Sequence, residues 1–314
     1  MSDVAIELRN VQKSFVKGHP VLKRVSLQIN RGEMVALIGA SGSGKSTLIR
    51  TVSGLLRTDA DENGRSGTVQ ILGTVMQANG RVSRDAKQLR SRVGIVFQQF
   101  NLVPRLSVLK NVCFGFLGRV PGWRGTLGRF TRREKQQALL ALRRVGIEEQ
   151  ALKRGAALSG GQQQRAAIAR SLVQGSEILI ADEPIASLDP SSARRVMDIL
   201  ADLNKSDGIT VLVSLHQVEY ALGYCPRTIA LRDGEVVYDG PSDALTPAFL
   251  SELYGAESEE LFLPGLEATK AGGHTRPRHE AHGTRRPAIR VIGTRSHRLT
   301  SEYPAGQAAP AGGN

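Results

Sequence analysis

A glycine-rich segment at residues 39–47 constrains the fold of this chain more than any other feature. Its sequence, GASGSGKST, fits the phosphate-binding loop pattern G-x-x-x-x-G-K-[ST]. The apolar run before it, residues 34–38, is typical of a buried strand, and residues 47–52 are typical of the start of a helix. In such a unit the glycines let backbone N–H groups surround a polyphosphate. The pattern predicts a nucleotide site at Gly39, Ala40, Ser41, Gly42, Ser43, Gly44, Lys45, Ser46 and Thr47.

Four side chains near this loop have predicted roles. We expect Lys45 to reach the β- and γ-phosphates of the nucleotide and the Ser46 hydroxyl to take one position on Mg²⁺. The apolar run at residues 178–181 places Asp182 and Glu183 at the end of a strand. A carboxylate there suits Mg²⁺ coordination, which we assign to Asp182. Glu183 is placed to polarise an attacking water as a general base.

The composition is that of a globular chain with a basic tail. The chain has 314 residues, of which 40% are hydrophobic, and this is enough for a sizeable core. No apolar run approaches the roughly 20 residues that span a bilayer, and the N-terminus does not resemble a secretory signal. Cys113 and Cys225 lack a metal-ligand spacing, so we expect free thiols in a reducing, cytosolic compartment.

The net charge of +13 is unevenly distributed along the chain. Residues 270–314 contain eight Lys or Arg against Glu280 and Glu302, so this stretch carries +6. We expect residues 268–314 to be a disordered tail after a domain at residues 1–267, because the tail cannot bury enough apolar surface. Its composition favours a solvated extension over a segment that binds an anionic membrane or nucleic acid.

Strand and helix patterns alternate along the domain. Strands are predicted at residues 4–9, 25–29, 68–71, 93–97, 178–181 and 210–214, and an antiparallel pair at 228–231 and 235–238. Helices are predicted at residues 132–145, 162–173 and 191–203. This order predicts an α/β fold with a largely parallel sheet covered by helices. Residues 102–170 have helical patterns without a convincing strand, so we expect a helical insert there.

A second helix start lies in the sequence Leu158-Ser159-Gly160-Gly161-Gln162. Ser159 and the glycines predict an exposed helix N-terminus that suits an anion. A chain with one phosphate loop needs a second such site only if that site serves the nucleotide of another copy. We therefore expect a two-fold homodimer, in which each nucleotide lies between residues 39–47 of one copy and 159–162 of the other.

Taken together, these motifs resemble the ATP-binding cassette family over residues 4–255. Residues 158–162 are similar to the family signature, and residues 186–189, which end at Asp189, are similar to the D-loop of the dimer interface. The resemblance implies a P-loop fold with a mostly parallel core sheet, an antiparallel β subdomain and a helical subdomain. It also implies ATP hydrolysis with Mg²⁺.

The resemblance assigns three further residues. Gln98 matches the Q-loop glutamine, which implies a catalytic role and a position on Mg²⁺. His216 matches the switch histidine that contacts the γ-phosphate. Phe15 lies where the family places an aromatic ring against adenine, although a half-buried core aromatic would also explain it. The catalytic set is thus Glu183, His216 and Gln98.

A single cassette without a membrane span resembles the ATPase subunit of a bacterial importer, peripheral on the cytoplasmic side of the inner membrane. Such a subunit docks on separate permease subunits, and a periplasmic or surface binding protein delivers the solute. Stretches at residues 100–112, 118–128, 214–220, 224–234 and 237–241 resemble the phosphonate-importer subfamily.

Two alternatives remain open. One is an importer ATPase for another solute, such as phosphate or a polar amino acid. The other is a cassette subunit of a soluble carbon–phosphorus lyase-type complex. Nucleic acid is not an expected partner, because the basic cluster at residues 119–133 has little aromatic interleaving. That cluster is interpreted as a solvated or permease-facing surface.

Overall fold

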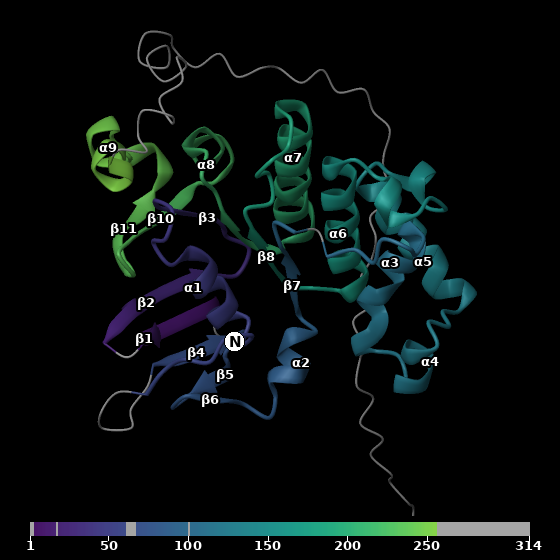
Figure 1. Ribbon diagram of the computed structural model, residues 1–314, viewed down its shortest axis with the longest axis horizontal. Helices are drawn as coiled ribbons and strands as arrows, with labels where there is room; N and C mark the ends of the chain where they lie inside the picture. Colours follow the sequence, from purple (N-terminus) through teal and green to yellow (C-terminus); the bar gives the residue numbers. More distant parts are fainter. Residues whose placement is uncertain (1–2, 17, 61–66, 100, 256–314) are drawn as a thin grey trace, which may run out of the picture. The chain divides into compact units, whose positions relative to one another are not determined.

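The strands predicted at residues 34–38, 93–97, 178–181, 210–214, 228–231 and 235–238 form the larger of the two sheets in the described part of the chain (Figure 1). The computed structural model describes residues 3–16, 18–60, 67–99 and 101–255. The strand order is β11-β10-β3-β9-β8-β7, in which all neighbours are parallel except β10 and β11. These strands are β3 (Met34–Ile38), β7 (Val93–Val96), β8 (Ile178–Asp182), β9 (Thr210–Ser214), β10 (Arg227–Arg232) and β11 (Glu235–Pro241).

The interior strands β3, β9 and β8 are buried along their whole length. Continuous apolar runs suit this position, because both faces of a parallel sheet are covered. Parallel strands also bring their carboxyl ends to one edge of the sheet. The loop after β3, the carboxylates of Asp182 and Glu183, and His216 beyond β9 therefore lie at the same edge. This is the edge at which open α/β sheets bind ligands.

The second sheet is antiparallel and has the order β2-β1-β4-β5-β6. Its strands are β1 (Val4–Val16), β2 (His19–Asn30), β4 (Thr68–Ile71), β5 (Thr74–Ala78) and β6 (Arg81–Val82). The strands predicted at residues 4–9, 25–29 and 68–71 are confirmed inside β1, β2 and β4. The sequence did not predict β5 and β6, because β5 has no regular alternation of buried and exposed residues and β6 is very short.

Helix α1 (Lys45–Val52) lies between the two sheets and shares one apolar core with both. Leu48 and Ile49 of α1 belong to the same buried cluster as Ile6 and Leu8 of β1 and Leu37 of β3. Burial of side chains of this size stabilises a fold by about 1.5–3 kcal/mol each. The start of α1, and with it the glycine-rich loop, is therefore held from two sides.

The other helices are α2 (Ala86–Arg90), α3 (Val108–Cys113), α4 (Gly122–Thr126), α5 (Arg132–Arg144), α6 (Gly160–Gln174), α7 (Pro190–Asp207), α8 (Val218–Tyr224) and α9 (Pro247–Tyr254). The three predicted helices are confirmed as α5, α6 and α7. The short helices α2, α8 and α9 were not predicted, because few turns leave little periodicity to detect. Helices α3, α5 and α6 pack against one another within the predicted insert (Figure 1).

Several sequence expectations concern the ends of the domain and its cysteines. The predicted boundary at residue 267 and the tail at residues 268–314 lie outside the described residues, so both stay predictions. None of the described helices is long and apolar enough to span a membrane. Cys113 and Cys225 are buried free thiols, and burial raises their pKa values to about 11 and about 12. Both side chains therefore stay protonated and unreactive at neutral pH.

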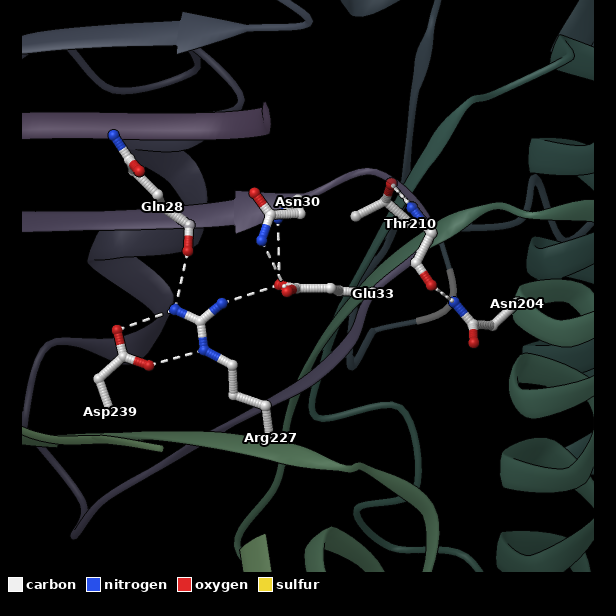
Figure 2. A network of polar contacts seen from close by, with 8 residues as sticks. Gln28, Asn30, Glu33, Asn204, Thr210, Arg227 and Asp239 are labelled. Carbon is white, nitrogen blue, oxygen red and sulfur yellow. Dashed lines mark hydrogen bonds and ion pairs between the residues drawn. The ribbon is translucent and has the colours of Figure 1, made fainter. Parts of the chain in front are cut away.

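Arg227 at the start of β10 ties the two sheets together (Figure 2). Its guanidinium donates to both carboxylate oxygens of Asp239 on β11, at 2.7 and 2.9 Å, and to Oε2 of Glu33 at 2.8 Å. It also donates to the backbone carbonyl of Gln28 on β2 at 2.9 Å. Glu33 in turn accepts from the side chain of Asn30 at 2.9 Å. The fork geometry of arginine suits this site, because one planar group satisfies two carboxylates and a carbonyl.

Replacing Arg227 with methionine is expected to lower the free energy of unfolding by about 1–2 kcal/mol. Methionine keeps most of the side-chain volume but leaves Glu33 and Asp239 without their shared cation. The measurement is urea unfolding followed by circular dichroism. Arg232→Met on the same strand is the control, because Arg232 pairs with the exposed Glu252 at 2.7 Å. Equal losses of stability in the two variants would contradict the role assigned to Arg227.

Candidate nucleotide-binding site

The loop between β3 and α1 has the backbone that its sequence predicts. Gly39 has a φ of 148°, and a Cβ atom placed there would lie 2.2 Å from the carbonyl oxygen of Leu231 on β10. Gly44 has a φ of 103° and directly precedes α1. Both positions therefore require glycine, because L side chains rarely adopt these conformations. The loop turns back on itself and leaves the N-terminus of α1 open toward a pocket.

The pocket at this loop has a volume of about 290 Å³. It is lined by Val21, Ser41, Gly42, Ser43, Gly44, Lys45, Ser46, Thr47, Glu183 and His216. The structure thus brings together most of the predicted loop residues, the predicted general base and the predicted switch histidine. Val21 of β2 was not predicted, and no sequence signal distinguishes it from other strand residues.

Two buried polar groups of the loop suit a polyphosphate ligand. Lys45 is only 5% exposed, and its ammonium group donates to the carbonyls of Gly39 at 2.7 Å and Ala40 at 3.0 Å. The hydroxyl of Ser43 is buried and makes no hydrogen bond to any described residue. Buried polar atoms are normally paired, so an unpaired hydroxyl in a ligand-sized pocket indicates a partner from outside the chain. A phosphate oxygen is such a partner, and the helix N-terminus adds to the attraction for anions.

The side chain of Asp182 is held beside the loop by two hydroxyls. Its Oδ1 accepts from Ser46 Oγ at 3.2 Å and from Ser214 Oγ at 2.9 Å. Asp182 is buried, with 6% of its surface exposed. One carboxylate and one hydroxyl beside a phosphate site form the kind of donor set that Mg²⁺ uses, because this ion takes few protein ligands and keeps water and phosphate oxygens. The residues present therefore fit Mg²⁺.

Glu183 and His216 are in direct contact. His216 Nε2 lies 2.6 Å from Glu183 Oε1, and both residues line the pocket. The hydrogen bond from His216 is the main cause that lowers the pKa of Glu183 below its ordinary value of 4.5. Partial burial opposes the shift, and the charge of Lys45 adds to it. Glu183 is therefore a carboxylate at neutral pH, which is the form that can accept a proton from water.

Gln98 and Phe15 are among the predicted residues that do not line the pocket. Gln98 is exposed and lies two residues beyond the end of β7. Phe15 of β1 is 64% exposed, so it is not a core aromatic, and its ring centroid lies 5.8 Å from the ammonium group of Lys13. Strand pairing places its neighbour Ser14 opposite Pro20, close to Val21 of the pocket. The roles assigned to Gln98 and Phe15 stay predictions.

The second helix start forms as the sequence predicts but does not reach the pocket of its own chain. Ser159 precedes α6, its hydroxyl accepts from the backbone N–H of Gln162, and Gln162 Oε1 accepts from the N–H of Ser159 at 3.0 Å. This reciprocal pair is a capping box, and Ser159 remains exposed. Gly161 is buried, and a Cβ atom there would lie 2.7 Å from the side chain of Ser192. Gly160 is partly buried beside it.

Asp189 caps the neighbouring helix α7. Its Oδ1 accepts from the N–H of Ser192 at 3.0 Å and from the hydroxyl of Ser191 at 2.6 Å. These hydrogen bonds, that from Ser191 first, lower the pKa of Asp189. Asp189 does not line the pocket either. The signature and Asp189 thus lie at the starts of two adjacent helices, outside the nucleotide pocket of the same chain.

Sequence reasoning missed Ser214, which contacts both predicted carboxylate residues. Its hydroxyl donates to Asp182 and accepts from the backbone N–H of Glu183 at 2.9 Å. The residue lies at the end of β9, opposite Asp182 in the pairing with β8. The sequence signal that would have identified Ser214 is a polar residue at the end of an apolar strand, in a sheet where another apolar strand ends at Asp182 and Glu183.

Comparisons with known proteins identify the family of this chain. A family model described as ABC transporter matches residues 22–186. The chain is 57% identical over 258 residues to the phosphonates import ATP-binding protein PhnC 1 of Pseudomonas aeruginosa, covering 82% of this chain and 91% of that protein. It is 55% identical over 280 residues to the phosphonates import ATP-binding protein PhnC of Paraburkholderia xenovorans, covering 89% and 91%.

Among solved structures, the fold is similar to that of a bacterial ABC transporter cassette, MJ0796. The dimeric form of that cassette superposes with a TM-score of 0.66 at 34% identity, covering 76% of this chain and 100% of the cassette. A second structure of MJ0796, a post-hydrolysis dimer bound to ADP and Pi, gives a TM-score of 0.64. With the family model matching more than half of the sequence and relatives covered over most of their length, this chain belongs to the ABC transporter family.

Proposed function

We propose that this chain is the ATP-hydrolysing subunit of a bacterial ABC importer that energises phosphonate uptake across the inner membrane. The observation that carries the proposal is the 57% identity to a phosphonates import ATP-binding protein over 91% of that protein's length. The pocket at the glycine-rich loop supplies the chemistry, since it combines a phosphate cradle with a carboxylate base.

Residues in and beside the pocket have separate tasks in the proposed hydrolysis. Lys45 and the loop N–H groups bind the β- and γ-phosphates of ATP. Ser46 and Asp182, with Gln98 as a further ligand, would hold Mg²⁺, which would supply positive charge against the phosphates. Glu183 orients the attacking water and accepts its proton. His216, which contacts Glu183 at 2.6 Å, holds that carboxylate in place and reaches toward the γ-phosphate.

The remaining site residues act from a second copy of the chain. Ser159, Gly160, Gly161 and Gln162 do not line the pocket of their own chain, yet they form an intact helix start that suits a phosphate. In the proposed homodimer this start closes over the nucleotide of the other copy, with Asp189 at the interface. Phe15, which is exposed beside the pocket, stacks on adenine. ATP binding therefore closes the dimer, and hydrolysis reopens it.

The proposed partners are integral permease subunits and a periplasmic or surface phosphonate-binding protein. The chain itself is a peripheral subunit on the cytoplasmic side of the inner membrane. Opening and closing of the cassette dimer drives the permease, while solute recognition belongs to the permease and the binding protein.

ATP hydrolysis by the chain reconstituted with its genomically neighbouring permease and binding protein tests this function. We expect alkylphosphonates, but not phosphate or amino acids, to stimulate turnover. A complex that contains Glu183→Gln is the matched control, because it assembles in the same way without the base. Stimulation by another solute would contradict phosphonate as the substrate, and failure to assemble with any permease would favour a soluble complex.

A further inference from the structure

The side chain of Ser214 contacts both Asp182 and Glu183, the two consecutive carboxylate residues at the end of β8. Ser214 is the last residue of β9, it is fully buried, and it lies opposite Asp182 in the parallel pairing of β8 with β9. Its hydroxyl acts there both as a hydrogen-bond donor and as an acceptor. It donates to Asp182 Oδ1 at 2.9 Å and accepts from the backbone N–H of Glu183 at 2.9 Å.

The bond to Glu183 matters because the backbone of this residue is unusual. Glu183 has a φ of 50°, which lies in the left-handed region of backbone conformation. Residues other than glycine and asparagine seldom adopt this conformation. Such a conformation persists only where the surroundings hold it. The Ser214 hydroxyl supplies one of these restraints by binding the N–H of the turned residue. The turn sets where the Glu183 carboxylate lies, 2.6 Å from His216 and in the wall of the pocket.

Two other buried serines, Ser171 and Ser242, make hydrogen bonds without such a connection. The Ser171 hydroxyl, 3% exposed, bonds to the carbonyl of Ala167 one turn earlier in the same helix. The Ser242 hydroxyl, also 3% exposed, pairs with Thr228 at 2.7 Å, and neither residue lines the pocket. Ser214 differs because its two partners are a carboxylate beside the phosphate loop and the backbone of the predicted general base.

We propose that Ser214 is a positioning residue for ATP hydrolysis. Its hydroxyl holds the backbone turn at Glu183, so that the carboxylate faces the place of the attacking water. Ser214 does not line the pocket, so we assign it a positioning role and not a catalytic one. The proposal rests on the proposed function, because it concerns the rate at which this pocket hydrolyses ATP.

Replacing Ser214 with alanine is the direct test. Alanine removes the hydroxyl without adding volume, so we expect the fold to persist. Outer partners that orient active-site groups typically contribute 10- to 100-fold, and we expect kcat to fall by about that factor. KM for ATP and the equilibrium affinity for a fluorescent ATP analogue should stay within about twofold, because the phosphate loop is intact. Ser242→Ala is the matched control, since it removes an equally buried serine hydroxyl away from the pocket.

A double substitution separates positioning from general loosening of the fold. If Ser214 acts through Glu183, then Ser214→Ala should cause little further loss in single-turnover hydrolysis once Glu183→Gln is present, because residues that act as a unit are not additive. Ser214→Thr, which keeps a hydroxyl on a β-branched side chain suited to a strand, should restore part of kcat.

Three outcomes would overturn the proposal. The first is an unchanged kcat in Ser214→Ala, and the second is a rise in KM that accompanies the fall in kcat of this variant. The third is that Ser214→Ala lowers the single-turnover rate by the same factor whether residue 183 is Glu or Gln. A wild-type chain that binds but never hydrolyses ATP would instead contradict the proposed function itself. Wild-type turnover is therefore measured first, and it distinguishes the two failures.

Discussion

Replacing Glu183 with glutamine is expected to lower ATP turnover by about 10²–10⁴-fold while leaving ATP binding intact. Glutamine has nearly the same shape and can still hydrogen-bond to His216, but its amide cannot accept a proton from water. Lys45 and the rest of the phosphate loop are unchanged. The dimer that closes on ATP should therefore persist. Steady-state phosphate release measures turnover, and analytical ultracentrifugation with ATP measures the trapped dimer.

The matched control for this variant is Glu177→Gln. Glu177 lies just before β8, at the end of the strand opposite to the pocket, and pairs with Arg92 at 2.5 Å. This carboxylate is 42% exposed, so its loss should change stability by no more than about 1 kcal/mol and leave turnover unchanged. Near-normal turnover in Glu183→Gln would contradict the assignment of Glu183 as the base. Loss of ATP binding in the same variant would show instead that the pocket had been disrupted.

Replacing Lys45 with alanine is expected to weaken ATP binding itself, by about 10- to 100-fold, because charge-assisted hydrogen bonds contribute about 1.5–3 kcal/mol. The Lys45 ammonium group is buried and lies at the wall of the pocket, where the surroundings screen its charge less than water does. Equilibrium titration with a fluorescent ATP analogue measures the affinity. The apparent loss of activity should diminish as the ATP concentration is raised.

Lys205→Ala is the control for the charge change, because Lys205 is exposed in the last turn of α7. It removes the same charge from the chain but should leave ATP affinity within about twofold. Thermal unfolding without nucleotide should establish that Lys45→Ala is folded. An unchanged ATP affinity in a folded Lys45→Ala variant would refute the role of Lys45.

Most of the parallel sheet could be predicted because its strands are continuous apolar runs. The runs at residues 34–38 and 210–214 match β3 and β9 in both bounds. The antiparallel pair β10–β11 was also predicted, because Asp233 and Gly234 form a turn between two strand patterns. Prediction failed for β5 and for the short helices α8 and α9, whose burial depends on neighbours distant in the sequence.

The positions of some residues of the candidate site could also be predicted from the sequence, and those of others could not. Residues 41–47 of the loop and Glu183 line one pocket, because each follows from a strand that ends at the same edge of the sheet, and their functional roles stay predictions. Phe15 follows no such rule, whereas Gln98 comes two residues after β7 of the same sheet but does not line the pocket. Both are exposed outside the pocket of the single chain, and their proposed roles depend on the bound nucleotide and on the closed dimer.

The sequence by itself determined the phosphate loop, the strand that delivers Asp182 and Glu183, and the capped start of α6, because each depends on residues adjacent in the chain. Only the tertiary structure decided that Ser214 bonds both Asp182 and Glu183, from 32 and 31 positions away. It also decided that Arg227 joins β2, β11 and the turn at Glu33. The physical reason is that the pairing of strands distant in the sequence creates these contacts, and no local pattern of residue types specifies which hydroxyl or guanidinium lies opposite which carboxylate.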